Sequence, residues 1–534
     1  MPAVTLVAGF EVMLVFMAAA IALKLVARRL RVPPAAALIV GGAVLALVPG
    51  IPAIELDPDL ILTLVLPPLL LAGAYLTSWR AFRTDLRIIL QLAVGAVLFT
   101  TLVVGWIAHW LMPGLPWAAC FALGAIVSPP DAVAARAVLQ GLPLPKRAAT
   151  LLEGESLVND ATGLVLYRFA VASALTGTFD GMQAVASFGL LAVGGILIGT
   201  ASGWLASTAS SRIDDAELSV AISLLAAWGS YIIAEHLNAS GVLSTVACGI
   251  VMGWRQHALL RAEVRIRTRA VWDTVTFVLE TLVFILIGLS LQGVLHRLLG
   301  GSSERLWDLV PQSALIVTTV ILARFAWIIS TAYLVRALIP TLRKRDPYPP
   351  IGIPIVLSWA GMRGVVSLAA AVALPEAFPG RDFILATTFT VIVVTVLLQG
   401  STLAPLIRLL RLSEKADRPT PHLSEREARL RIASAELAAV RKRSALPDGS
   451  ERHPRLVEQY TYKVEAIGRV NTANGSPGSE RADHFGTVLA GVNAGRAELL
   501  KLHRSAAIDD VVLHTLESEL DSNEILARLR RGPA

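Results

Sequence analysis

Two aspartates, Asp131 and Asp160, lie inside apolar runs that are long enough to cross a lipid bilayer. An ionisable side chain at the bilayer centre costs roughly 2.5 to 3.5 kcal/mol, so each such residue needs a functional or structural reason. Around Asp160, the residues Ser156, Asn159 and Asp160 stand at positions i, i+3 and i+4. This spacing predicts that the three side chains share one face of a helix.

Carboxylate, hydroxyl, amide and carbonyl oxygens are hard ligands that suit a dehydrated monovalent cation. If Asp131 faces Asp160, a proton and such a cation compete for the same oxygens, which is the chemistry of ion exchange. The alternative is that the aspartates form buried salt bridges or helix caps, although the run around Asp160 offers it no basic partner. We therefore predict a site for a proton and a monovalent metal cation, formed by Asp131, Ser156, Asn159 and Asp160 with the carbonyl of Pro130.

Four further charged residues interrupt apolar runs, and we predict that they organise the helices in ion pairs. Arg363 is expected to hold Glu155 and the ends of broken helices in place. Glu280 and Arg324 are expected to form a second pair with a structural or gating role.

The composition indicates which elements must position these residues. The chain has 534 residues, of which 55% are hydrophobic and 16% charged, and its mean hydropathy is +0.64. A soluble domain has a lower apolar share and about a quarter charged residues. Apolar runs near twenty residues recur up to about residue 410 and predict about thirteen membrane spans. The alternation of basic loops places the N-terminus outside and the C-terminus in the cytoplasm.

Thirteen spans divide into six, one and six, so the two halves would be related by inverted topology, as in transporters. Interrupted helices are expected at equivalent places in the fifth span, at Ser128-Pro129-Pro130-Asp131, and in the twelfth, at Gly361-Met362-Arg363-Gly364. The predicted fold is thus an all-α polytopic membrane protein with two inverted six-helix repeats, broken crossing helices and a helical cytoplasmic tail. The membrane domain covers residues 1–411 and the tail covers 412–534.

Composition also argues against several partners. The net charge is +7, but the basic residues sit in short loops instead of on a basic face, so no nucleic acid partner is predicted. Only Cys120 and Cys248 are present, both in apolar segments, and we predict no disulfide framework, cofactor or resident metal cluster. The predicted partners are the lipid bilayer, a monovalent cation and the proton.

The sequence resembles the bacterial sodium/proton antiporters of the monovalent cation:proton antiporter-1 family, which are related to the eukaryotic sodium/hydrogen exchangers. The resemblance covers residues 1 to about 411 and rests on four stretches, at 128–134, 152–162, 280–288 and 361–364. The stretch Leu152-Glu153-Gly154-Glu155-Ser156-Leu157-Val158-Asn159-Asp160-Ala161-Thr162 is the most specific of them.

The resemblance implies a transporter in the inner (plasma) membrane, not an enzyme, that exchanges Na⁺, or Li⁺ or K⁺, for H⁺ in pH and sodium homeostasis. It implies an elevator motion of a core against a dimerisation scaffold, hence a homodimer. The Asn159-Asp160 pair implies electroneutral one-for-one exchange. The ligands that carry over are Asp131, Ser156, Asn159 and Asp160, with Glu155 and Arg363 organising the core.

Two departures from the family pattern concern the site. Pro130 stands where the family usually has Thr, so a hydroxyl is lost and the choice between Na⁺ and K⁺ stays open. Glu280 stands where bacterial members often have Asn and the eukaryotic exchangers have Glu.

Two activities of other classes fit these residues less well. An intramembrane aspartyl protease also has two membrane aspartates, but its Tyr-Asp and Gly-x-Gly-Asp signatures are absent at Asp131 and Asp160. A sodium-coupled symporter of organic anions requires substrate-sized polar chemistry at the helix breaks, and Asn159-Asp160 beside Arg363 is too small and too acidic.

Overall fold

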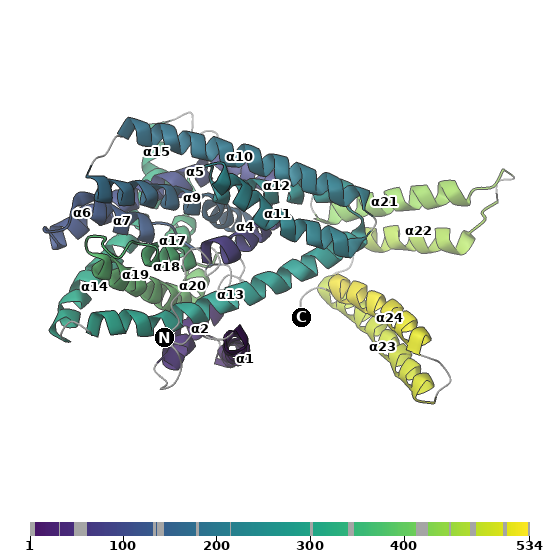
Figure 1. Ribbon diagram of the computed structural model, residues 1–534. Coiled ribbons are helices and arrows are strands. Elements are labelled where there is room, and N and C mark those ends of the chain that lie inside the picture. Colours follow the sequence, from purple (N-terminus) through teal and green to yellow (C-terminus); the bar gives the residue numbers. More distant parts are fainter. Residues whose placement is uncertain are drawn as a thin grey trace. The chain divides into compact units, whose positions relative to one another are not determined.

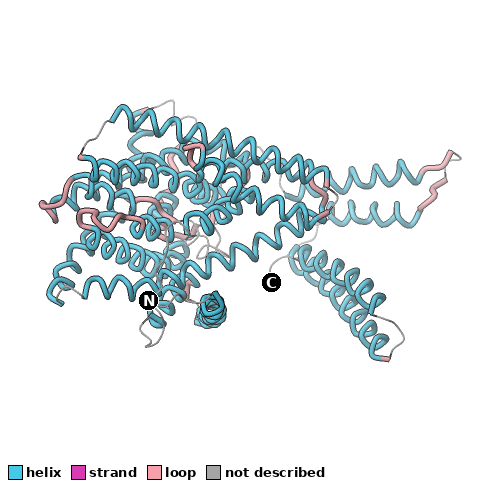
Figure 2. Tube along the Cα trace, in the orientation of Figure 1, coloured by secondary structure: helices cyan, strands magenta, loops and turns pink. Residues whose placement is uncertain are grey.

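The computed structural model describes most of the chain, and the described residues are almost entirely helical (Figures 1 and 2). It describes residues 6–30, 32–46, 61–131, 135, 144–177, 181–213, 215–299, 303–339, 346–412, 425–447, 450–469, 477–505 and 510–531. The chain divides into two compact units, Met1–Arg418 and Pro419–Ala534. Besides helices, the described residues contain one isolated β-bridge, between Ala445 and Glu451.

The first unit contains α-helices and short π-helical segments, labelled η, that continue neighbouring α-helices. In chain order these are α1 (Leu6–Leu30), α2 (Pro34–Ala46), η1 (Ile61–Val65), α4 (Leu66–Leu76), α5 (Trp79–Leu90), η2 (Gln91–Ala96), α6 (Val97–Leu111), α7 (Trp117–Val127), α9 (Lys146–Thr176), α10 (Gly181–Arg212), α11 (Ala216–His236), α12 (Gly241–Leu259), α13 (Ala262–Leu299), α14 (Ser303–Ile329), η3 (Ser330–Leu334), α15 (Val335–Leu338), α17 (Gly352–Trp359), α18 (Val365–Val372), α19 (Arg381–Val394), η4 (Thr395–Gln399) and α20 (Gly400–Leu409).

Six helical stretches in the described part of the chain are long and apolar enough to cross a membrane, and they confirm a multi-pass membrane protein. They cover Trp79–Leu111, Ala186–Arg212, Ala216–His236, Ala262–Leu289, Leu309–Leu338 and Arg381–Leu409. Shorter apolar helices lie at Pro34–Ala46, Leu62–Leu76 and Trp117–Val127. The count of thirteen spans and the inverted repeat stay predictions.

The helices of the first unit pack in two groups. The first bundle comprises α1, α2, α4 and α10 to α13, and the second bundle comprises α5, α6, α7, α9, α14, α15 and α17 to α20. Contacts within each bundle are dense, whereas the contacts between the bundles are sparse. The second bundle therefore joins two separate stretches of the chain, about 79–176 and 303–409, into one body.

Glycines allow the closest helix approach in the first bundle. Gly195, Gly199 and Gly203 recur every fourth residue on α10 and face α12. A Cβ atom on Gly199 would lie 1.9 Å from the carbonyl oxygen of Ser244, so no larger residue fits this crossing. Small residues at this spacing let transmembrane helices pack backbone against backbone where no hydrophobic effect drives them together.

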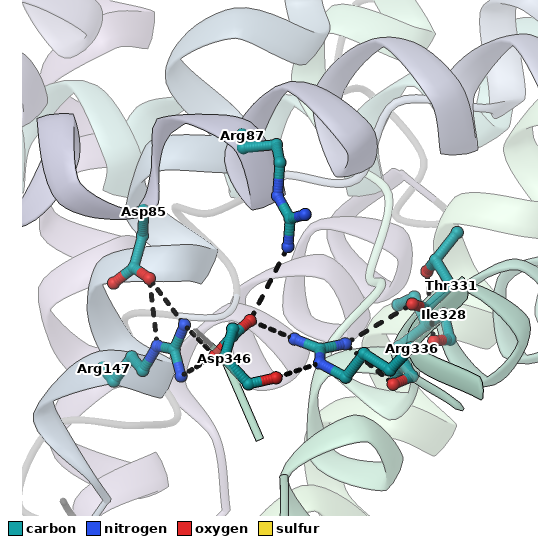
Figure 3. Close-up of polar contacts among 8 residues, drawn as sticks. Asp85, Arg87, Arg147, Ile328, Thr331, Arg336 and Asp346 are labelled. Carbon is teal, nitrogen blue, oxygen red and sulfur yellow. Dashed lines mark hydrogen bonds and ion pairs between the residues drawn. The ribbon is translucent and has the colours of Figure 1, made fainter. Parts of the chain in front are cut away.

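A polar network joins the two stretches of the second bundle at the end predicted to face the cytoplasm (Figure 3). Arg147 at the start of α9 donates to Asp85 of α5 at 2.8 Å and lies 3.3 Å from a carboxylate oxygen of Asp346. Asp346 also pairs with Arg336 of α15, and Arg87 lies 3.7 Å away. Two carboxylates thus neutralise most of the charge of three arginines.

The second unit consists of helical hairpins. It contains α21 (Glu425–Ser444), α22 (Pro454–Arg469), α23 (Pro477–Arg504) and α24 (Asp510–Arg531). α21 packs on α22, and α23 packs on α24. Arg496 of α23 forms ion pairs with Asp521 and Glu524 of α24, each at 2.6 Å.

Candidate cation and proton site

Two interrupted helices of the second bundle meet at the centre of the site. α7 ends at Val127, because Pro129 and Pro130 have no backbone N–H with which to continue a helix. The second interruption separates α17, which ends at Trp359, from α18, which begins at Val365. The backbone amide of Asp131 donates to the carbonyl of Met362 at 2.7 Å, so the two interruptions are in direct contact.

Gly364 permits this contact. A Cβ atom at this position would lie 1.7 Å from the carboxylate oxygen Oδ2 of Asp131, well inside van der Waals contact. The absence of a side chain at Gly364 therefore fixes where the Asp131 carboxylate can lie.

Arg363 satisfies the carbonyl groups that the interrupted helices leave free. Its guanidinium donates to the carbonyls of Val127 at 2.8 Å and Ser128 at 3.3 Å, and also to the carbonyl of Gly361. The side chain is 1% exposed. A cation at the C-terminal end of α7 also opposes the negative end of the helix dipole.

Arg363 holds the ends of the broken helices as predicted, whereas Glu155, its other expected partner, acts on it through charge and hydrogen-bonds a different arginine. Glu155 of α9 pairs with Arg324 of α14, through two hydrogen bonds of 2.5 and 2.8 Å, and Arg324 also donates to the carbonyl of Leu357 in α17. Glu155 and Arg324 are 1% and 2% exposed. The pairing of Glu280 with Arg324 was therefore wrong, because the guanidinium of Arg324 is already occupied by Glu155 and Leu357.

A cavity with about 50 Å³ of space for water lies beside the two interruptions. A single buried water needs roughly 10 to 15 Å³, so the cavity can hold a small hydrated ion. Its polar lining consists of carboxylates and one hydroxyl, and the remainder is apolar: Asp131, Glu153, Ser156, Asp160 and Glu280, with Leu62, Val65, Leu66, Leu69, Leu70, Gly73, Leu157, Val283, Val365 and Val366. Three predicted ligands, Asp131, Ser156 and Asp160, therefore face one cavity.

The other two predicted ligands lie behind this lining. The side-chain amide of Asn159 donates to the carbonyl of Pro130 at 2.7 Å, and neither residue lines the cavity in the described part of the chain. Asn159 is fully buried, and its Oδ1 atom has no hydrogen-bond partner among the described residues. Asn159 thus ties α9 to the interrupted segment that carries Asp131.

Sequence reasoning missed one cavity residue and misassigned another. Glu153 stands three residues before Ser156 and seven before Asp160, so the helical period that grouped the latter two could have added it. Glu280 comes from α13, on the opposite wall of the cavity. Lys24 of α1 interacts electrostatically with Glu280 and stacks 3.8 Å from the ring centroid of Phe277.

A multi-pass helical protein in which two interrupted helices meet beside a carboxylate-lined cavity is a membrane ion transporter. Residues 13–409 match the model of the sodium/hydrogen exchanger transmembrane family. The chain belongs to this family, whose members are antiporters and not enzymes.

Related proteins occur in several bacteria. A Na⁺/H⁺ exchanger of Mycobacterium tuberculosis is 33% identical, over 97% of this chain and 96% of its own length. The Na⁺/H⁺ exchanger YjcE of Escherichia coli is 31% identical, over 89% of this chain and 90% of its own length. The Na⁺/H⁺ antiporter NhaH of Halobacillus dabanensis is 30% identical, over 75% of this chain and 98% of its own length.

The fold resembles that of the sodium proton antiporter MjNhaP1 from Methanocaldococcus jannaschii. The TM-score is 0.60 at 18% identity, and the match covers 75% of this chain and 98% of that structure. The matched structure confirms the all-helical membrane fold. The family model confirms the family assignment made from the motif around Asn159 and Asp160.

Proposed function

We propose that this protein exchanges Na⁺, or Li⁺ or K⁺, for H⁺ across the plasma membrane in pH and sodium homeostasis. The observation that carries the proposal is the convergence of Asp131, Ser156 and Asp160 on one small cavity. Asp131 and Asp160 line the same cavity, and a negative charge on one disfavours a negative charge on the other.

Asp160 is the proposed shared carrier, because it lies on the cavity wall and is only 7% exposed. A buried carboxylate is unfavourable as a bare charge, so it holds either a proton or a cation. Loss of one then requires gain of the other, which couples the two fluxes. Ser156 supplies a neutral oxygen to the cation, and Asn159 positions the backbone of Pro130 beside Asp131.

The proposed motion is an elevator movement of the second bundle against the first. The cavity lies between them: η1, α4 and α13 supply one wall, and α9, α18 and the segment at Asp131 supply the other. Sparse contacts between the bundles lower the cost of sliding one past the other. The first bundle is then the scaffold through which a homodimer assembles.

One-for-one exchange follows if Asp160 alone changes its occupant during the cycle. The loaded second bundle then carries the same charge with H⁺ or Na⁺ bound. Asn159 supports this stoichiometry, because it places an amide, and not a second titrating acid, beside Asp160. The proposed orientation has the N-terminus outside and the tail in the cytoplasm.

K⁺ is the second candidate cation. A relative in Bacillus subtilis, 32% identical over 64% of this chain and 53% of its own length, is described as a sodium, potassium, lithium and rubidium/H⁺ antiporter. Pro130 also stands where the family usually has Thr, so this position next to Asp131 offers no hydroxyl.

Proteoliposomes that enclose a pH indicator test the proposal. Outward gradients of NaCl, LiCl or KCl should each be compared with choline chloride at equal osmolarity. We expect Na⁺ to acidify the lumen, and the response to K⁺ decides between the two candidate cations. Equal responses to choline and to every alkali cation would contradict the antiport proposal.

A further inference from the structure

A second, larger pocket lies outside the ion site, where the corner between α4 and α5 meets the corner between α12 and α13. It has about 600 Å³ of space for water. Its walls are aromatic and basic, and the residues that line it are Tyr75, Leu76, Thr77, Ser78, Trp79, Arg80, Gly253, Trp254, Gln256, His257, Ala262, Arg265, Ile266 and Arg269. Both corners follow spans whose basic loops are predicted to face the cytoplasm.

The pocket carries an uncompensated positive charge. Arg80 comes from α5, and Arg265 and Arg269 come one helical turn apart from α13. The lining includes no aspartate or glutamate, and none of these three arginines forms an ion pair with a described carboxylate. Arg265 donates to the carbonyl of Leu260.

Unlike the pocket arginines, the arginines of the polar network around Asp346 form ion pairs with carboxylates. In Figure 3, Arg147 and Arg336 converge on Asp346, and Arg147 also contacts Asp85. Both sets lie at the same predicted end of the membrane domain. The positive-inside tendency therefore accounts for the presence of arginine at this end, but not for three guanidinium groups around a cavity without an acid.

A buried hydroxyl group adds an independent observation. Tyr75 is 4% exposed and lines the pocket, and its hydroxyl has no hydrogen-bond partner among the described residues. Arg265 and Arg269 line the same pocket as this hydroxyl, and their positive charges act on it. Leaving a buried hydroxyl unpaired costs free energy, and an acceptor oxygen in the pocket removes that cost.

The outer rim of the pocket is apolar and exposed. Trp254 is 62% exposed and Ile266 is 70% exposed, whereas Trp79 is half-buried. Tryptophans at span ends are typical of the membrane interface, where the ring contacts acyl chains and the indole N–H meets the headgroups. A ligand that occupies the basic pocket and also covers its apolar rim carries an anionic head and an apolar tail.

We propose that this pocket binds the headgroup of an anionic phospholipid. Arg80, Arg265 and Arg269 contact the phosphate, the hydroxyl of Tyr75 donates to a phosphate oxygen, and the acyl chains run over Trp254 and Ile266. The lipid bridges α5 of the second bundle to α13 of the first. It is thus placed to restrain movement between the bundles.

The test uses the full chain, purified in detergent, stripped of lipid and examined by native mass spectrometry. The probes are phosphatidylglycerol, phosphatidylcholine and inorganic phosphate. We expect wild-type protein to retain phosphatidylglycerol and to melt at a higher temperature in its presence. Phosphatidylcholine and inorganic phosphate should produce neither effect.

A matched pair of double variants separates the pocket from general surface charge. Arg80→Gln with Arg269→Gln removes two lining arginines, and the dissociation constant for phosphatidylglycerol should rise roughly 30-fold. Arg83→Gln with Arg267→Gln removes the same charge from the same two helices, outside the pocket lining. This control should bind as wild type does. Tyr75→Phe should weaken binding without a change in net charge.

Two results would overturn the proposal. Equal loss of lipid by both double variants would mean that binding reflects overall charge and not this pocket. Stabilisation by inorganic phosphate with none by phosphatidylglycerol would mean that a free anion, and not a lipid, occupies it.

Discussion

The backbone amide of Asp131 donates to the carbonyl of Met362 at 2.7 Å, and this bond joins the two interrupted helices at the edge of the cavity. The two residues are far apart in sequence and belong to the two separate stretches that form the second bundle. A shift of either stretch therefore moves the Asp131 carboxylate, and the ion site depends on both.

Asp160→Asn should abolish cation-driven proton flux, because a neutral isostere removes the exchangeable charge without leaving a hole. The melting temperature in detergent should stay near that of the wild type. Flux is measured in proteoliposomes under a Na⁺ gradient, with Asp273→Asn, on an exposed residue of α13, as the control. Wild-type rates in Asp160→Asn would remove Asp160 from the site.

Gly364→Ala should sharply reduce transport, because its Cβ atom overlaps the position of Asp131 Oδ2. The adjustment displaces the Asp131 carboxylate from the cavity. Gly229→Ala is the matched control, since a Cβ atom there meets no other atom within 4 Å. Proton flux at saturating Na⁺ checks the prediction, and equal activity in the two variants would contradict the close approach.

Arg324→Ala should strongly destabilise the protein, because it leaves Glu155 charged, buried and unpaired. Removing one partner of a buried ion pair costs roughly 3 to 5 kcal/mol. The double variant Glu155→Ala with Arg324→Ala should lose less stability than the sum of the two single variants. Thermal unfolding in detergent of all four proteins measures this coupling, and additive losses would mean that the pair is not coupled.

Arg363→Ala should destabilise the second bundle mainly because the carbonyl groups of Val127, Ser128 and Gly361 lose their donor. Each buried carbonyl left without a donor costs about 1 to 3 kcal/mol. Arg363→Lys should recover only part of the loss, because one ammonium cannot span the carbonyls of Val127 and Gly361 as a guanidinium does. The melting temperature should therefore fall from wild type to Arg363→Lys to Arg363→Ala. Any other order would contradict the role of Arg363 as donor to these carbonyls.

The exchange equilibrium should not respond to membrane potential if Asp160 alone changes occupant. Each uncompensated charge moved across the bilayer contributes about 2.3 kcal/mol per 100 mV. A K⁺/valinomycin potential across proteoliposomes, with Na⁺ as the exchanged cation, provides the test. A shift would show that another cavity carboxylate of the second bundle, such as Asp131 or Glu153, also carries a proton through the cycle.

Much of this protein could be predicted from its sequence. Apolar runs near twenty residues form helices in a bilayer, because every backbone N–H and C=O group there must find its hydrogen-bond partner within the protein. Pro129 and Pro130 require an interruption wherever they occur in such a run. The helical period places Ser156 and Asp160 on one face, so local rules predicted the class of protein, the helix breaks and three cavity residues.

Tertiary structure decided which charged groups face each other. Glu155, Glu280, Arg324 and Arg363 were each recognisable as buried charges, but their pairing depends on contacts between helices far apart in sequence. The predicted hydrogen-bonded pairs differ from the observed ones because backbone carbonyls also compete for the arginines: Arg324 donates to Glu155 and to the carbonyl of Leu357. The guanidinium of Arg363 donates its hydrogen bonds to the carbonyls of Val127, Ser128 and Gly361. Glu155 instead accepts hydrogen bonds from Arg324. The sequence predicted that Arg363 holds the broken helix ends, but only the packed structure shows that Glu155 hydrogen-bonds Arg324.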